Sequence, residues 1–299
     1  MAHLAREQRL RLSAVAMVLS GTMALLFAPG IRAQSNREAS QARIRVIASV
    51  SPAGANLSKE QLSAFVDDRP AVVQDVVSAS EQPLVFAIII DISASLYDKQ
   101  EQAFEKESSL ELFRQLARAP NTGFFGDFND ELYLSHKPAS VDSVLQEIKN
   151  IGQFRGGTAL HDAVLDAAKL VSRAAKGTSS RRAVFVFTDG QENASNLNLK
   201  QVVPELQRQG VPIFCVGFLD PQVPNKAATL QSLSSSTGGI AVLLSEVREV
   251  IQMLVGETRY QYWLTVESES PNDGKLHSFA VRSHEINLRI SVPSQIPAR

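Results

Sequence analysis

Short apolar runs alternate with amphipathic stretches through the middle of the chain. The run Leu84 to Ile90 is apolar throughout, which favours a central parallel strand covered on both faces over a half-exposed strand. Further strands are expected at 123–128, 131–134, 183–187, 214–218 and 240–244, and helices at 103–116, 141–151, 159–175, 199–209, 227–236 and 247–255. Pro204 predicts a helix start close to it or a kink. The alternation predicts an α/β fold with a doubly wound, mostly parallel sheet and helices on both faces.

The segments on either side of this region are rich in predicted strands. They are expected at 42–50 and 71–77 before it, and at 260–267, 279–282 and 286–292 after it. Chain termini often lie close together, so we expect the two flanks to pair as one small β-rich domain. The predicted domains are an N-terminal flank at 34–81, an α/β domain at 82–256, and a C-terminal flank at 257–299 that packs with residues 42–80.

The first residues have the layout of a secretory signal peptide. Three arginines precede the apolar run Ser13 to Ala28, and Pro29-Gly30 and the small Ala33 follow it. This run is shorter than the roughly 20 residues that span a bilayer, which favours cleavage of residues 1–33 over a retained N-terminal membrane anchor. We therefore expect a secreted or periplasmic protein with no membrane span after cleavage.

Composition narrows the range of partners. The 299 residues are 44% hydrophobic, which suits one large domain and a smaller one. The formal net charge is -1, and cleavage of the signal peptide would remove four arginines and one glutamate. Without a basic field or a basic run, nucleic acid is not an expected partner. Cys215 is the single cysteine, so no intramolecular disulfide is possible, and its apolar surroundings predict a buried, unreactive thiol.

Oxygen-bearing side chains follow two of the predicted strands. Asp91, Ser93 and Ser95 stand at alternate positions directly after the first apolar run, and Asp189 follows another strand in Phe-Thr-Asp-Gly. Thr158 ends a Gly-Gly-Thr loop just ahead of a helix. Ligands of open α/β sheets bind beyond the carboxyl ends of the strands, so we expect the three segments to converge there. Carboxylate and hydroxyl oxygens are the ligands that hard cations such as Mg²⁺ prefer.

The motifs Asp-x-Ser-x-Ser, Gly-Gly-Thr-Ala-Leu and Thr-Asp-Gly together resemble the metal-ion-dependent adhesion site of the von Willebrand factor type A (VWA) domain. The resemblance covers about residues 82–256. With its β-rich flanks and signal peptide, the chain is also similar to a bacterial group of secreted proteins built around this domain. Ala94 and Leu96 stand where glycine and methionine are common, but neither position is a ligand.

The resemblance implies a role for each residue of the site. Ser93, Ser95 and Thr158 would be direct oxygen ligands, and Asp91 and Asp189 would act mostly through water. An open position on the cation would accept an Asp or Glu carboxylate of a protein partner. The expected cation is Mg²⁺, with Mn²⁺ or Ca²⁺ as alternatives.

Three residues near these motifs are candidates for contact with the partner: Arg155, His161 and Glu192. Each also has a simpler interpretation, as a solvated loop arginine, a packed histidine and a surface acid. Asp98 has the same two interpretations as Glu192.

Three functions remain open. The first is an exported, divalent-cation-dependent adhesion protein. The second is a metal-dependent hydrolase or phosphoryl-transfer enzyme. However, aspartate-based phosphatases place a second carboxylate where this chain has Ser93, and there is no Gly-x-Ser-x-Gly motif. The third is a non-catalytic envelope scaffold with incidental metal binding. The sequence favours the first, and we expect no enzymatic activity.

Overall fold

The computed structural model describes residues 42–52, 54–217, 224–242, 247–269 and 273–297. The predicted signal peptide at 1–33 and the segment 34–41 lie outside these residues. Among the described helices, none is long and apolar enough to cross a membrane. The described residues belong to one compact part of the chain.

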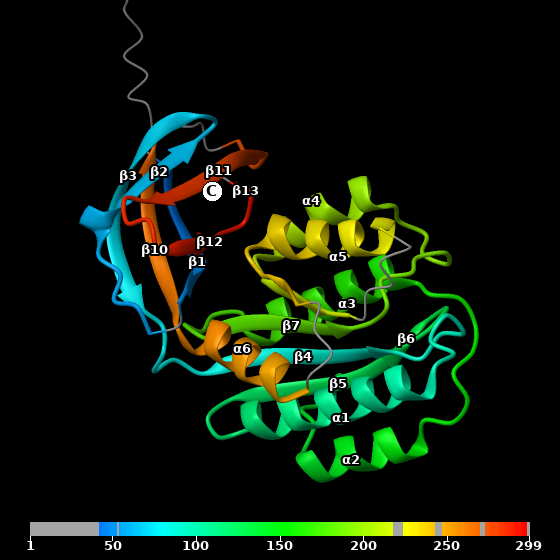
Figure 1. Cartoon of the computed structure of the whole chain (residues 1–299). Coiled ribbons are helices and arrows are strands. Elements are labelled where there is room, and N and C mark those ends of the chain that lie inside the picture. The colour runs from blue at the N-terminus through cyan, green and yellow to red at the C-terminus, as the bar shows by residue number, and fades with distance from the viewer. Residues whose placement is uncertain (1–41, 53, 218–223, 243–246, 270–272, 298–299) are drawn as a thin grey trace, which may run out of the picture. The chain divides into compact units, whose positions relative to one another are not determined.

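A six-stranded sheet forms the α/β part of the chain (Figure 1). Its strands are β4 (Leu84–Asp91), β5 (Thr122–Phe128), β6 (Leu132–Leu134), β7 (Arg181–Phe187), β8 (Ile213–Val216) and β9 (Ala241–Val242). The order is β6-β5-β4-β7-β8-β9, and every neighbouring pair is parallel except β5 and β6. The antiparallel edge strand β6 returns from β5 through the short turn at Asn129-Asp130.

Helices cover both faces of this sheet (Figure 1). They are α1 (Lys99–Leu116), α2 (Val141–Asn150), α3 (Leu160–Ala174), α4 (Leu199–Gln209), α5 (Pro224–Thr237) and α6 (Val247–Arg259). Alternate residues of β4 belong to two separate cores: Val85, Ala87 and Ile89 pack with α3, α4 and α5, and Phe86, Ile88 and Ile90 with α1, α2 and α6. Both faces are apolar because both are covered, which confirms the predicted doubly wound α/β fold.

Helix α4 corrects one prediction. It begins at Leu199, so the alternative of a helix start near Pro204 is wrong. The Asn198 side chain accepts a hydrogen bond from the Gln201 N–H, and the Gln201 side chain accepts one from the Asn198 N–H. This reciprocal cap and the burial of Val202 and Leu206 outweigh the one backbone hydrogen bond that Pro204 cannot make.

The two flanks form a single antiparallel sheet of seven strands. They are β1 (Ala42–Ser51), β2 (Leu62–Val66), β3 (Arg69–Ser78), β10 (Gln261–Ser268), β11 (Leu276–Ser283), β12 (Arg289–Ser291) and β13 (Gln295–Pro297). The order is β12-β1-β10-β3-β2-β11-β13, and a short 3-10 helix, η1 (Lys59–Gln61), precedes β2. Strand β10 of the C-terminal flank pairs with β1 and β3 of the N-terminal flank, which confirms the predicted pairing. The domain boundaries themselves stay a prediction.

The last predicted strand is partly wrong. Residues 284–287 form a bend and turn, and Ile286 is fully exposed. Only 289–291 pair, as β12, with the end of β1. The apolar residues of this segment suggested a longer strand, but only three residues reach a partner at the sheet edge. Strands β2 and β13 were not expected.

A histidine between two carboxylates joins the β2–β3 turn to β11. His277 Nδ1 lies 2.6 Å from Asp67 Oδ2, and its Nε2 lies 3.0 Å from Asp273 Oδ1. The hydrogen bonds with Asp67 and Asp273 raise the pKa of His277, and the bond to His277 lowers the pKa of Asp67. The Lys275 backbone N–H, and then His277, hold the pKa of Asp273 at about 2. Protonated His277 therefore stabilises this corner of the sheet.

We expect the stability of the protein to fall as His277 loses its proton. A pKa raised in the folded state gives a contribution that is complete below the ordinary value of 6.5 and is lost as pH rises through the raised value. Both carboxylates stay ionised over this range. Thermal melting between about pH 5 and 9 should show this loss for the wild type and not for His277→Gln. The control is His136→Gln, since His136 makes no ion pair within the described part of the chain. Parallel curves for wild type and His277→Gln would contradict the assignment.

Candidate metal-ion site

Asp91 is the last residue of β4 and is fully buried. Its Oδ1 accepts a hydrogen bond from the Ser93 N–H at 2.8 Å, and its Oδ2 accepts one from the Thr188 hydroxyl at 2.7 Å. Thr188 directly follows β7, the parallel neighbour of β4, so the strand pairing brings the two residues together. The carboxylate is thus fixed in orientation at the carboxyl edge of the sheet.

The electrostatics of Asp91 are unfavourable in the absence of a cation. Burial raises its pKa from 3.8 to about 6, and the negative charge of Asp189 adds to this. The hydrogen bonds from Ser93 and Thr188 act in the opposite direction, but they do not compensate fully. A cation beside these two carboxylates would reverse the balance.

The hydroxyls of Ser93 and Ser95 lie next to each other in the loop that follows β4. Their Oγ atoms are 2.9 Å apart, and Ser93 is buried. The same loop is hydrogen-bonded to the glycine loop, through Ala94 N–H to Gly156 O at 3.2 Å and Arg155 N–H to Ile92 O at 2.8 Å. Backbone contacts therefore hold two of the predicted segments side by side.

Thr158 is positioned by its backbone. Its N–H donates to Asn193 Oδ1 at 2.7 Å, and the preceding Gly157 N–H donates to Asp130 Oδ1 at 2.7 Å. A side chain on Gly157 would lie 2.6 Å from Asp130 Oδ1 and 2.9 Å from the Ala194 Cβ, so this position requires glycine. The Thr158 hydroxyl is buried, and no described residue forms a hydrogen bond with it.

Asp189 follows Thr188 and is nearly buried. Its Oδ1 accepts a hydrogen bond from the Gln191 N–H at 2.8 Å, and its Oδ2 forms an ion pair with Lys226 Nζ at 2.7 Å. Lys226 lies on α5 and was not expected at the site. The structure thus brings all five predicted site residues to one edge of the sheet and adds one positive charge to them.

The candidate residues at the rim differ in their surroundings. Arg155 is exposed. His161 is buried on α3, with Nδ1 2.9 Å from Leu197 O. Glu192 accepts hydrogen bonds from the His161 N–H and from the Ser195 hydroxyl, and so caps the start of α3. Asp98 is the N-cap of α1 and accepts from the Gln100 N–H.

Two further residues near the site were missed. The Thr188 hydroxyl donates a hydrogen bond to Asp91. The feature of the sequence that could have indicated this is the threonine of the Thr-Asp-Gly motif. Glu105 of α1 is buried, and neither of its carboxylate oxygens has a hydrogen-bond partner among the described residues. Burial, followed by the charges of Asp91 and Asp189, raises the pKa of Glu105 well above its usual value.

The predicted inert thiol, Cys215, lies buried in β8, and burial raises its pKa to about 12.

A model of the von Willebrand factor type A domain matches residues 87–254, more than half of the chain. The chain belongs to this family. VWA domains are associated with metal-dependent adhesion and protein interaction. No curated protein matches the chain.

Solved structures match the chain at low identity. An aerotolerance-related membrane protein from Bacteroides fragilis has 16% identity and a TM-score of 0.48, over 58% of this chain and 98% of that one. A VWA protein from Catenulispora acidiphila has 13% identity and a TM-score of 0.49, over 89% and 74%. Proximal thread matrix protein 1 of the mussel byssus, whose metal-ion-dependent adhesion site (MIDAS) motif is occupied by zinc, has 18% identity and a TM-score of 0.49, over 63% of this chain and 48% of that one.

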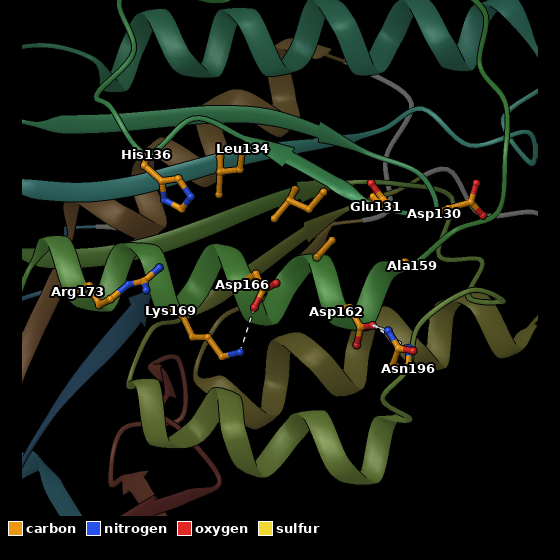
Figure 2. A pocket seen from close by; sticks show the side chains of 12 residues that line it. Asp130, Glu131, Leu134, His136, Ala159, Asp162, Asp166, Lys169, Arg173 and Asn196 are labelled. Carbon is orange, nitrogen blue, oxygen red and sulfur yellow. Dashed lines mark hydrogen bonds and ion pairs between the residues drawn. The ribbon is translucent and has the colours of Figure 1, made fainter.

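A polar groove of about 550 Å³ lies next to the candidate metal-ion site, between β6 and α3 (Figure 2). Ala159, which follows Thr158, lines it. Figure 2 shows Asp130 and Asp162 toward one end and His136 and Arg173 toward the other. Asp162 is held by the Asn196 backbone and side-chain amides. The groove therefore carries charges of both signs, and two of them, Asp166 and Lys169, form an ion pair within it.

We expect Asp91→Asn to stabilise the VWA domain when no cation is present. Because the folded pKa of Asp91 is raised from 3.8 to about 6, its ionisation destabilises the folded state increasingly between these values and fully above them. The neutral amide removes this penalty, which is about 3 kcal/mol at neutral pH and close to zero near the ordinary pKa. Urea unfolding in chelator at the two pH values measures the difference.

The matched control is Asp166→Asn on α3. Asp166 is exposed, and among the described residues it forms a surface ion pair with Lys169 and no other, so this change should alter the unfolding free energy by less than about 0.5 kcal/mol. If the difference in unfolding free energy between Asp91→Asn and wild type were the same at the two pH values, the carboxylate would not be under electrostatic strain.

Proposed function

We propose that this protein is an exported VWA-domain protein that binds one divalent cation and uses it to capture an Asp or Glu carboxylate of a protein partner. The proposed ligands are Ser93, Ser95 and Thr158, with Asp91 and Asp189 acting mostly through water. Mg²⁺ is the proposed cation, with Mn²⁺ or Ca²⁺ as alternatives. The observation that supports this most directly is the buried Thr158 hydroxyl, which has no hydrogen-bond partner among the described residues.

The residues present fit a hard cation. A buried hydroxyl without a partner loses free energy, so its retention calls for a partner that is not a protein group. Two more hydroxyls and two carboxylates lie at the same edge, and all five side chains offer oxygen. No group of three or more His, Cys, Asp or Glu side chains that could hold a metal occurs in the described ranges. The donor set thus depends on hydroxyls, which suit Mg²⁺ better than a soft metal.

The hydroxyl ligands also favour capture of an outside anion. Neutral ligands in direct contact leave much of the cation's positive charge uncompensated, and this charge attracts a carboxylate. The exposed Arg155, next to the glycine loop, adds a second positive charge at the rim. Export is proposed from the signal-peptide layout of residues 1–33.

Thr158→Val should separate metal binding from stability. We expect it to weaken Mg²⁺ and Mn²⁺ binding by at least about tenfold, because a direct ligand is lost. The same change should stabilise the cation-free protein by about 1 kcal/mol, because it removes a buried hydroxyl without a hydrogen bond. Calorimetric titration and urea unfolding measure the two effects.

Thr258→Val is the matched control. Thr258 is also buried, but its hydroxyl donates to Leu254 O, so its removal should cost about 1 kcal/mol and leave metal binding unchanged. Equal metal affinity in wild type and Thr158→Val, or no binding by either, would refute the proposed site. Hydrolase turnover abolished by Ser93→Ala would favour the enzyme alternative.

Carboxylate capture can be tested with a minimal probe. Acetate added to the Mn²⁺-loaded protein should show strong broadening of its methyl proton resonance, because it binds at the paramagnetic ion. Acetamide has nearly the same shape but no charge and should show far less. The Thr158→Val variant corrects for Mn²⁺ in solution. Similar broadening of acetate and acetamide would contradict carboxylate capture even if the cation binds.

A further inference from the structure

A cavity of about 370 Å³ is lined by four arginines and by no acidic residue. The arginines are Arg43, Arg45, Arg182 and Arg208. They stand out because the chain as a whole has a formal net charge of -1. We call this cavity the arginine pocket. Apolar side chains, among them Ile44 and Ile296, form part of its wall and lower the local dielectric constant.

Three elements bring the arginines together. Arg43 and Arg45 stand at alternate positions of β1 and so lie on one face of it, while Arg182 is on β7 and Arg208 is in the last turn of α4. The described residues of these elements belong to one compact part of the chain. Gln207 Nε2, next to Arg208, donates to Ser294 Oγ at 3.0 Å. The four arginines are therefore positioned by two strands and one helix.

The pocket's positive charge is only partly compensated. Arg43 pairs with Glu267 at 2.8 Å and Arg208 with Glu205 at 2.5 Å, and neither glutamate lines the pocket. The Arg208–Glu205 pair is exposed, so it contributes little free energy and is easily exchanged. In the other pair Arg43 is exposed, whereas the Glu267 side chain is only 19% exposed. The Arg45 guanidinium lies 4.5 Å from the centre of the Trp263 ring and makes no ion pair within the described chain.

We propose that the arginine pocket binds a small phosphorylated molecule, independently of the metal-ion site. Guanidinium groups bind phosphate oxygens through paired N–H donors, and several of them at one place suit an anion with more than one charge. A monocarboxylate would use only one. The volume lies within the range of small-ligand sites, roughly 300 to 1,000 Å³. Arg45 and Arg43 are exposed on β1 and can reorient toward the ligand.

Trp263 gives a direct measurement. It is the single tryptophan of the chain and lines the pocket, so its fluorescence reports on this site alone. We expect glycerol 1-phosphate and inorganic phosphate to change the fluorescence of the full chain saturably at low salt, with chelator present to exclude the metal-ion site. Glycerol and acetate should have no saturable effect. Binding should weaken at high salt, as for any charge-based contact.

Arg45→Gln should weaken phosphate binding by about tenfold, as expected for loss of one charge-assisted contact. Arg282→Gln is the matched control, because Arg282 is also exposed and also stacks on an aromatic ring, that of Phe65, but does not line the pocket. Thermal melting without ligand shows that both variants fold. Since fluorescence of Arg45→Gln could change for local reasons, calorimetry with glycerol 1-phosphate is the second readout.

Three results would overturn the proposal. The first is no saturable binding of either phosphate. The second is equal affinity for acetate and inorganic phosphate, which would indicate general anion attraction. The third is binding to vesicles that contain an anionic phospholipid, but to neither soluble phosphate, which would assign the pocket to a lipid surface. Equal losses in Arg45→Gln and Arg282→Gln would likewise exclude a specific pocket.

Discussion

Two buried carboxylates at one edge of the sheet are the constraint on which the site depends. Asp91 and Asp189 lie close enough for the charge of one to raise the pKa of the other. The protein offsets this with the Thr188 hydroxyl, the Ser93 N–H and the Lys226 ammonium. These groups come from three different segments, so the carboxylates can stay buried only while the segments stay together. The same unfavourable charge supports the proposed cation site at this edge.

The sheet supplies this closeness. Strands β4 and β7 are parallel neighbours in register from Leu84↔Arg181 to Ile90↔Phe187, so both end at the same level and both are followed by oxygen-bearing residues. A one-residue slip would also exchange the two faces of β4, which pack in separate cores. Core packing therefore fixes the register, and the register fixes the site. The glycine loop adds Thr158 through its backbone N–H groups, which donate to the side chains of Asp130 and Asn193. These side chains lie so close that Gly157 cannot be larger.

Patterns of the sequence predicted those features that depend on local chemistry. The uniformly apolar β4 indicated two covered faces, and the residues after β4 and β7 indicated the edge where the site forms. Predictions failed where contacts with other parts of the chain decide the extent of a helix or strand. Pro204 stays within a helix because of the cap at Asn198, and Ile286 is exposed because no strand reaches it. Lys226 and Glu105 approach the site from helices whose orientation no spacing in the chain reveals.

The near-neutral net charge of the chain conceals a separation of charge between two places. At the sheet edge, Asp91 and Asp189 are buried and only partly compensated by groups of the chain. A cation bound there through neutral hydroxyls would keep much of its charge for an outside anion. In the arginine pocket, Arg43, Arg45 and Arg208 are exposed, and Arg45 makes no ion pair within the described chain, so the proposed pocket would attract anions without a cation. Both proposed sites would recruit anionic groups, but only the first would respond to a chelator, and it is the less exposed to solvent. Screening by salt acts more strongly on exposed charges than on buried ones. Chelation and ionic strength therefore act on different sites of the same chain.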